Sequence, residues 1–356
     1  MRGLILAGGH GTRLRPLTST GNKHMLPVAN QPILFYGLRH LAAAGIREVG
    51  LVLGPIQEGI REGVGDGGAF GLSVTYIEQP DPRGLADAVL RAGDFLGEEP
   101  FLMYLGDNLL QSGVTPFVRA FASERPDAVI GVARVAHPER YGVVELADGR
   151  IRSIEEKPAH PRSDLALVGV YLFSPAVHPV VRSLGPSSRG ELEITDAIRA
   201  LWSDRGRVAV LPVEGWWKDT GRPEDLLEAN SLVLGSLPES AFEGAGVWEA
   251  GSVREGPVGT GSGTWVAAGA TVLGPTLLGD RARVEEGSRV GPECAIGPEV
   301  VIRSSTVRRS IIMAGSRIEG VRLVDSIIGR NTVVRAGTPG DREVRLTVGD
   351  SSQVVL

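Results

Sequence analysis

A six-residue repetition of apolar side chains constrains the fold of this 356-residue chain more than any other feature. From residue 266 an apolar residue recurs at every sixth position, often with glycine or alanine next to it. Neither the 3.6-residue period of an amphipathic helix nor the two-residue period of a strand explains this spacing. A period of six is typical of a parallel β-helix, in which each coil stacks its apolar residues on the previous coil. The regular positions are Val266, Val272, Leu278, Val284, Val290, Ile296 and Ile302.

The repetition continues to residue 334 with steps of five or six residues. A glycine-rich stretch at residues 235–251 precedes it, and such stretches commonly separate structural elements. We therefore predict one domain at residues 1–240 and a β-helix domain at residues 247–356. The later repeat positions are Val307, Ile312, Ile318, Leu323, Ile328 and Val334.

The first 235 residues have a different pattern, in which short apolar runs alternate with helical spacing. This alternation predicts an α/β domain with a mostly parallel, Rossmann-like sheet, whose ligands bind at the carboxyl ends of the strands. The expected strands are residues 4–7, 49–53, 74–77 and 101–105, and a helix is expected at residues 85–96.

Three glycines within residues 8–11 follow the apolar run at residues 4–7. Glycine lets the backbone turn sharply and approach a ligand closely, and bare N–H groups after a strand form a cradle for phosphate. Arg13 and Lys23 add two cations nearby. A dinucleotide fingerprint is excluded because Leu14 stands at its third glycine position, and no Walker A string occurs.

Residues 8–18 match the pattern G-G-x-G-T-R-L-x-P-x-T, and residues 23–28 match K-x-x-L-P-V. With these motifs the chain resembles the sugar-1-phosphate nucleotidylyltransferases, in particular the long type of thymidylyltransferase that acts on glucose 1-phosphate. The resemblance covers the whole chain. It implies a Rossmann-like nucleotidyltransferase domain followed by a left-handed parallel β-helix.

The segment Q-P-x-P-x-G-L-A at residues 79–86 follows an expected strand. It is either a proline-stiffened turn that leads into a helix or a base-reading loop. The Gln79 amide can donate and accept hydrogen bonds and so match the edge of a pyrimidine, and Gly84 lets a ring lie against the backbone. The loop resembles the base-reading loop of thymidylyl- and uridylyltransferases.

Asp107 follows the carboxyl end of the strand expected at residues 101–105, and a carboxylate in that position suits Mg²⁺. An aspartate that only caps the next turn is the alternative. The surrounding G-D-N resembles the metal site of the family, and the family pattern W-x-D-T-G implies that Asp219 is the second metal ligand. We interpret Trp217 as a packing residue.

The resemblance assigns the remaining roles residue by residue. Arg13, Lys23 and Lys157 are the implied catalytic cations. The implied nucleotide-binding residues are Leu6, Gly8, Gly9, Gly11, Thr12, Arg13, Lys23, Gln79, Gly84 and Asp107. The implied sugar-phosphate-binding residues are Gly142, Glu156, Lys157 and Arg189, and the implied metal ligands are Asp107 and Asp219.

The implied reaction is transfer of a thymidylyl group from dTTP to α-D-glucose 1-phosphate, with dTDP-glucose and pyrophosphate as products and Mg²⁺ as cofactor. A UTP-dependent uridylyltransferase remains an alternative, because thymine and uracil share the edge that Gln79 would read. A non-catalytic regulator that binds sugar nucleotides is a second alternative. An additional acyltransferase activity of the tail is disfavoured, because none of the six histidines lies in the repeats.

Composition limits the partners and the compartment. A net charge of −5 leaves no polybasic footprint, so we do not expect nucleic acid as a partner. No basic segment precedes a long apolar run, so we expect neither a signal peptide nor a membrane span, and the cytoplasm is the expected compartment. The single Cys294 excludes an internal disulfide and is expected to be a small buried residue. The tail is expected to be structural or to form a homo-oligomer.

Overall fold

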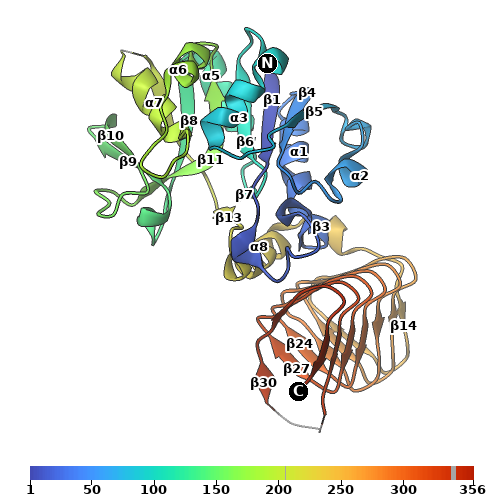
Figure 1. The fold of residues 1–356 in the computed structure, drawn as a ribbon. Helices are drawn as coiled ribbons and strands as arrows, with labels where there is room; N and C mark the ends of the chain where they lie inside the picture. Colours follow the sequence, from blue (N-terminus) through green and yellow to red (C-terminus); the bar gives the residue numbers. More distant parts are fainter. Residues whose placement is uncertain (205, 338–341) are drawn as a thin grey trace. The chain divides into compact units, whose positions relative to one another are not determined.

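The structure is a computed structural model that describes residues 1–204, 206–337 and 342–356 (Figure 1). Contacts within the chain divide it into two compact units. We call Met1–His10 with Leu34–Asp219 the sheet unit, and Gly11–Ile33 with Thr220–Leu356 the β-helix unit. The domain ranges expected from the sequence stay a prediction.

The sheet unit is built on a nine-stranded sheet with the strand order β10-β9-β11-β6-β1-β4-β5, to which β8 and β12 add next to β11. The strands are β1 (Arg2–Ala7), β4 (Glu48–Leu53), β5 (Ser73–Glu78), β6 (Phe101–Leu105), β8 (Ala128–Arg134), β9 (Gly142–Ala147), β10 (Arg150–Glu156), β11 (Leu165–Phe173) and β12 (Val208–Pro212). Strands β6, β1, β4 and β5 are parallel, which confirms the expected Rossmann-like arrangement. The whole sheet is mixed, because β11 enters antiparallel to both β6 and β8.

The four expected strands fall within β1, β4, β5 and β6. The helix expected at residues 85–96 divides at Ala92 into α3 and α4. Apolar side chains of β1, β6, α3, α6 and α7 share one buried core. The helices are α1 (Ile33–Ala43), α2 (Ile60–Val64), α3 (Leu85–Arg91), α4 (Gly93–Leu96), α5 (Thr115–Glu124), α6 (Val177–Ser183) and α7 (Ile194–Ser203), with short 3₁₀ turns at η3 (Gly68–Phe70) and η4 (Pro138–Arg140).

The C-terminal coils form a prism with three parallel sheets, and Figure 1 shows the coils stacked along one axis. One face holds β14 (Val247–Trp248), β17 (Trp265–Val266), β20 (Arg283–Val284), β23 (Val301–Arg303), β26 (Arg317–Glu319), β29 (Val333–Arg335) and β32 (Gln353–Val355). The second holds β15 (Val253–Glu255), β18 (Thr271–Leu273), β21 (Arg289–Val290), β24 (Thr306–Arg308), β27 (Arg322–Val324) and β30 (Glu343–Val344). The third holds β16 (Val258–Thr260), β19 (Thr276–Leu278), β22 (Cys294–Ile296), β25 (Ile311–Ile312), β28 (Ile327–Ile328) and β31 (Thr347–Val348).

The register of these sheets explains the period of six. Val266 pairs with Val284, and Val284 pairs with Ile302, so each of these coils consists of three six-residue steps. Ile302 pairs with Ile318, a coil of 16 residues that contains the shorter steps. Every apolar position of the repeat is buried in one continuous core. The expected β-helix is confirmed, and the arrangement is consistent with the left-handed form.

Buried hydroxyl groups connect successive coils. The backbone N–H of Ser326 donates to Ser310 Oγ at 3.1 Å, and the N–H of Leu346 donates to Ser326 Oγ at 3.0 Å. Cys294 lies one coil before Ser310 and is buried. Burial raises the pKa of its thiol to about 12, so the thiol stays protonated and packs as a small residue, as expected.

Residues 11–33 and α8 (Pro223–Ser236) attach to the β-helix in the same unit. The Asn230 side chain accepts a hydrogen bond from Ala29 N at 2.9 Å and donates to Glu293 O at 3.2 Å. Asn30 Nδ2 donates to Ile296 O at 2.8 Å. This attached part also contains η1 (Thr12–Leu14), η2 (Lys23–Met25), β2 (Pro27–Val28), β3 (Gln31–Pro32) and η5 (Glu239–Phe242).

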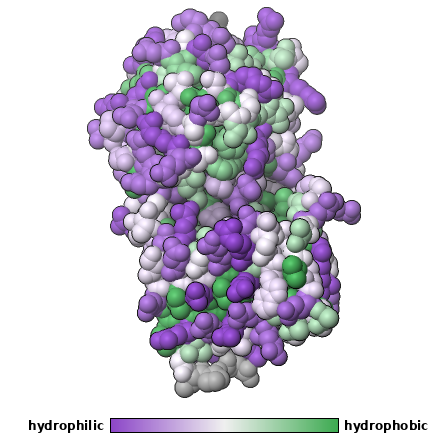
Figure 2. Space-filling view, turned by 90° about the vertical axis from the view of Figure 1, so that its right-hand side faces the viewer, coloured by the Kyte–Doolittle hydropathy of each residue, from purple (hydrophilic) through white to green (hydrophobic). Residues whose placement is uncertain are grey.

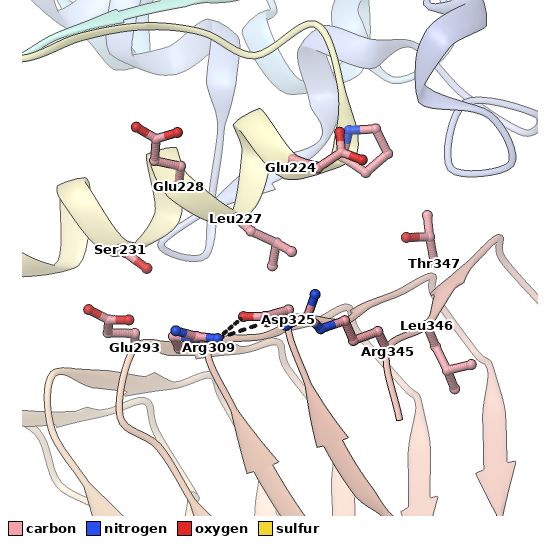
Figure 3. A pocket seen from close by; sticks show the side chains of 11 residues that line it. Glu224, Leu227, Glu228, Ser231, Glu293, Arg309, Asp325, Arg345, Leu346 and Thr347 are labelled. Carbon is pink, nitrogen blue, oxygen red and sulfur yellow. Dashed lines mark hydrogen bonds and ion pairs between the residues drawn. The ribbon is translucent and has the colours of Figure 1, made fainter. Parts of the chain in front are cut away.

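A cavity of about 550 Å³ lies between α8 and the edge of the β-helix (Figure 3). On the β-helix side, Arg309 and Arg345 both form ion pairs with Asp325, at 2.8 and 3.0 Å. Glu224 and Glu228 of α8 line the opposite wall. Charged side chains therefore line both walls of this cavity.

Hydrophilic side chains cover most of the face drawn in Figure 2, with smaller hydrophobic groups between them. Among the described residues, the large apolar side chains that are exposed are Met1, Val247, Val253, Val355 and Leu356, and all but Met1 belong to the first or last coils of the β-helix. None of the helices in the described parts of the chain is both long enough and apolar enough to span a membrane.

Candidate active site

The first glycine of the predicted phosphate loop lies where two parallel strands end. Leu6 lies in β1, and Gly8 and Gly9 follow this strand directly. A Cβ atom on Gly54 would collide with the Gly8 carbonyl, and a Cβ atom on Gly8 would lie 3.2 Å from Gln79 Oε1. Glycine at these positions therefore brings the β1 turn close to the side chain that follows β5.

Gln79 is buried, and its amide nitrogen has two partners. Nε2 donates to Asp87 Oδ2 at 2.8 Å and to Gly84 O at 3.3 Å. Asp87 also forms ion pairs with Arg83 and Arg91, at 2.9 and 3.0 Å. Burial by itself raises the pKa of Asp87, but the hydrogen bonds from Gln79, Arg91 and Arg83 lower it below its usual value. The carboxylate is therefore ionised at neutral pH.

Gly84 has a φ of 112°, and a side chain there would collide with the Leu192 backbone. Ala86 N donates to Leu192 O at 3.0 Å, and Leu192 N donates to Arg83 O at 2.8 Å. The predicted base-reading loop is thus joined to the segment before α7. This backbone contact is by itself sufficient reason for glycine at position 84, and contact with a base stays a prediction.

The two predicted metal ligands lie on paired segments. Strand β13 (Trp217–Asp219) pairs antiparallel with β7 (Asn108–Leu110), so that Asp219 lies opposite Asn108, the residue after Asp107. Asn108 is buried and donates from Nδ2 to Asp107 Oδ1 at 3.0 Å. Its Oδ1 accepts from Trp217 Nε1 at 2.6 Å and from Gly169 N at 3.3 Å. The pairing brings the two carboxylate-bearing segments together.

This donor set fits a magnesium ion. Asp107 and Asp219 would supply carboxylate oxygens from the two paired segments, and Mg²⁺ is commonly bound through one or two carboxylates together with substrate phosphates and water. Within residues 1–204, 206–337 and 342–356, no group of three or more His, Cys, Asp or Glu side chains could hold a metal ion. The pair of aspartates therefore suits an ion that also uses substrate oxygens.

The predicted sugar-binding residues gather around the end of β10. Thr195 Oγ1 donates to Glu156 Oε2 at 2.6 Å, and Lys157 Nζ lies 3.7 Å from Glu156 Oε1. A Cβ atom on Gly142 would lie 3.2 Å from Glu156 Oε2 and 3.1 Å from Thr195 Oγ1. Glycine at position 142 therefore leaves space beside the glutamate, and Glu156 is held in one orientation.

Arg189 joins the same cluster. Its Nη1 lies 3.2 Å from Glu156 Oε1 and 3.1 Å from Glu193 Oε1, and its Nη2 lies 3.2 Å from Glu191 Oε1. Burial raises the pKa of Glu193, and the negative charges of Glu156 and Glu191 raise it further. The hydrogen bond from Ser187 and the positive charge of Arg189 lower this pKa but do not cancel the rise. Contact of Arg189 with a sugar phosphate stays a prediction.

The remaining predicted phosphate ligands belong to the β-helix unit. Gly11 has a φ of 64°, which favours glycine, and it precedes the turn of η1 that contains Thr12 and the exposed Arg13. A Cβ atom on Gly11 would lie 3.1 Å from Lys23 Cβ. Within this unit, Lys23 therefore lies beside the glycine turn.

An asparagine cap sets the backbone at Lys23. Asn22 Oδ1 accepts from His24 N at 2.9 Å and lies 2.6 Å from His24 Nδ1, so Nδ1 carries the proton. This cap fixes the start of η2 at Lys23, and it therefore fixes the backbone position from which the Lys23 side chain extends.

Sequence reasoning missed four polar residues that hold the predicted ones in place. They are Asp87, Asn108, Glu193 and Thr195, and all four are buried. Each is within a quoted motif or directly next to one, so proximity to a motif was the available signal. None of the predicted site residues lines the cavity of Figure 3.

Comparison with known proteins shows which family this chain resembles. The sequence model of the family described as "Nucleotidyl transferase" matches residues 2–236. The chain is 48% identical to a glucose-1-phosphate thymidylyltransferase of Streptomyces griseus, over all of this chain and 99% of the relative. It is 46% identical to a protein of the same name from Streptomyces antibioticus, with the same coverage.

A solved structure has a similar fold over part of this chain. It is a Bacillus anthracis protein assigned as a glucose-1-phosphate thymidylyltransferase, in complex with a sucrose. The TM-score is 0.62 and the identity 37%, over 65% of this chain and 94% of that chain. Nucleotidyltransferases of this family generally depend on a divalent metal, and nucleotides and sugar phosphates fit them as substrates. The family match and the full-length similarity together mean that this chain belongs to the nucleotidyl transferase family.

Proposed function

We propose that this chain transfers a thymidylyl group from dTTP to α-D-glucose 1-phosphate, giving dTDP-glucose and pyrophosphate. The observation that carries the chemistry is the pairing of β7 with β13, which brings Asp219 opposite the residue after Asp107. The choice of substrates is supported by the names of the two full-length Streptomyces relatives.

The reaction needs no Ser, Cys or His nucleophile, because a phosphate monoester oxygen of the sugar phosphate can attack the α-phosphorus directly. Catalysis then consists of positioning and of charge stabilisation during in-line displacement. Arg13 and Lys23 hold the triphosphate and stabilise the departing pyrophosphate, and Lys157 aligns the sugar phosphate. We also assign phosphate binding to backbone N–H groups, those of Gly8 and Gly9 in the sheet unit and those of Gly11 and Thr12 in the β-helix unit.

Asp107 and Asp219 would hold the Mg²⁺ ion. When bound, the ion neutralises charge on the α-phosphate. Asn108 keeps the Asp107 carboxylate oriented through its 3.0 Å hydrogen bond.

In the proposed site the nucleotide base is bound by Leu6, Gln79 and Gly84, which we call the base side. The sugar phosphate is bound by Gly142, Glu156 and Arg189, which we call the sugar side. Glu156 accepts hydrogen bonds from sugar hydroxyls in this arrangement, because Thr195 already fixes its carboxylate. The two sides bring the α-phosphorus and the sugar phosphate into reach of one another.

A panel of nucleotides and hexose 1-phosphates tests the proposal through pyrophosphate release and identification of the sugar nucleotide. We expect dTTP with glucose 1-phosphate to give the highest kcat/KM, and EDTA to abolish turnover. A uridylyltransferase is the second candidate, because Gln79 would read an edge that thymine and uracil share. A preference for UTP would favour that candidate, and absence of product with every pair would refute transfer altogether.

We further infer a cytoplasmic homo-oligomer. Association of copies is supported by exposed apolar side chains on the outermost coils, namely Val247, Val253, Val355 and Leu356. Light scattering coupled to size-exclusion chromatography tests this, and a monomeric mass would contradict it.

A further inference from the structure

The orientation of the Gln79 amide follows from the chemistry of its neighbours. Its Nε2 lies 2.8 Å from Asp87 Oδ2 and 3.3 Å from the carbonyl oxygen of Gly84. An ionised carboxylate and a backbone carbonyl can only accept hydrogen bonds. The amide must therefore turn its NH₂ group toward them, and both of its hydrogens are used.

The partner that sets this orientation is itself held in place. Asp87 is 2% exposed and Gln79 is 4% exposed, so neither group exchanges its partner freely with water. Arg83 and Arg91 bind the Asp87 carboxylate from two sides and keep it ionised. A flipped amide would set Gln79 Oε1 against the negative charge of a buried carboxylate, which is strongly unfavourable.

Gln79 Oε1 is then oriented to act as an acceptor beside the Gly8 turn. A Cβ atom placed on Gly8 would lie 3.2 Å from this oxygen. Thymine and uracil carry a hydrogen on ring nitrogen N3 and can donate to this oxygen. Cytosine has an acceptor at N3, and the two acceptors would face each other. A polar site built for one hydrogen-bond pattern rejects the opposite pattern strongly.

We propose that Asp87 is a positioning residue that sets the base selectivity of this enzyme: it holds the Gln79 amide as an acceptor for an N3–H group, so that thymine and uracil nucleotides bind and cytosine nucleotides are rejected. The inference rests on the proposed function, because it assumes that the nucleotide base lies at Gln79.

The substitution Asp87→Asn tests this with almost no change in side-chain volume. Asparagine can turn its own NH₂ group toward Gln79 Oε1 and so permit the flipped amide. We expect kcat/KM for dTTP and dUTP to fall together by about tenfold or more, and the dCTP-to-dTTP ratio of kcat/KM to rise by at least about tenfold. An equal loss with all three nucleotides would mean that Asp87 only supports the fold, and would overturn the proposal.

A matched control separates the amide from the ion pairs. Arg91→Gln removes one ion pair of Asp87 but leaves the hydrogen bond between Asp87 and Gln79, so the dCTP-to-dTTP ratio should keep its wild-type value. A raised ratio in this control would contradict the role given to Asp87.

The unmodified enzyme provides a test that does not depend on folding of a variant. It should use dCTP at least about a hundredfold less efficiently than dTTP, and comparable efficiency would overturn the inference. The experiment also separates this inference from the proposed function. If Asp87→Asn turns over dTTP with an unchanged dCTP-to-dTTP ratio, only the inference is refuted. If no nucleotide is turned over by the unmodified enzyme, the proposed function is refuted.

Discussion

In the coils of the β-helix a buried serine hydroxyl accepts a hydrogen bond from a backbone N–H of the next coil, whereas in the sheet unit the buried Asn108 side chain meets a partner from a distant part of the chain. Ser310 accepts from Ser326, and Ser326 accepts from Leu346, each one coil further on. Asn108 instead accepts from Trp217, which is 109 positions away. The first arrangement is repeated in successive coils, and the second is built once.

The difference explains what each region can do. The same hydrogen bond recurs between successive coils, so the β-helix is regular and its structure depends on many equivalent residues. In the sheet unit, Asp87, Asn108 and Thr195 each fix one particular side chain of the candidate site. We therefore expect activity to depend on single residues of the candidate site, and the stability of the coils to depend on the apolar residues of the repeat.

The largest effect is expected for Asp107→Asn. Removing one carboxylate from the proposed Mg²⁺ site should lower kcat by about 10²- to 10³-fold, because charge on the α-phosphate is no longer stabilised. Pyrophosphate release measures this, and the melting temperature should stay close to that of the wild type.

Asp94→Asn, in α4 of the same unit, is the matched control and should keep normal turnover. Near-normal activity of Asp107→Asn would contradict the metal-site assignment.

Ile302→Ala in the β-helix is expected to lower stability and to leave activity nearly unchanged. Ile302 is fully buried between Val284 and Ile318 of the neighbouring coils. Its truncation should lower the free energy of unfolding of the β-helix by about 2–5 kcal/mol, while kcat at 25 °C changes little. Chemical denaturation followed by circular dichroism measures the loss.

Arg317→Ala, an exposed position on the adjacent strand β26, should change stability by less than about 0.5 kcal/mol. Equal stability losses in the two variants would mean that the apolar stack is not what holds the coils.

Acid should destabilise the sheet unit through His40. Burial lowers the pKa of this imidazole to about 4, whereas the unfolded chain has a value near 6.5. Between these values the unfolded chain binds more protons, so the stability that is present above pH 6.5 is lost as the pH falls toward 4. The loss amounts to up to about 3 kcal/mol.

Unfolding free energies at pH 7 and pH 4.5 measure this loss, and His40→Gln should reduce the difference between them. The repeats contain no histidine, so the β-helix should not share this dependence between pH 4 and 6.5. An unchanged pH dependence in His40→Gln would assign the acid sensitivity to another group.

The smallest effect is expected for Thr195→Val. The variant loses the 2.6 Å hydrogen bond to Glu156, so that only the ion pairs on Oε1 still orient its carboxylate. We expect KM for glucose 1-phosphate to rise about tenfold, which corresponds to one lost hydrogen bond to a charged group, with little change in KM for dTTP. Initial-rate kinetics with each substrate varied in turn measure this, and equal changes in both KM values would argue against a local role at the sugar side.

Much of the architecture could be predicted because it follows from spacing along the chain. The six-residue period alone predicts stacked coils, since only a coil of three such steps brings Val266, Val284 and Ile302 into one column. The alternation of apolar runs likewise predicted the parallel strands β1, β4, β5 and β6. The candidate residues Gly8, Asp107 and Asp219 were found from motif resemblance, and their roles stay predictions.

The sequence by itself determined the two kinds of architecture, because both depend on the period of apolar residues, which is a local property. Only the tertiary structure decided that β11 runs antiparallel within the sheet, that Gly84 packs against the Leu192 backbone, and that the Asp87 carboxylate holds the Gln79 amide. These features depend on which distant segments meet and on which polar groups lose water when they do. No pattern of neighbouring residues contains that information.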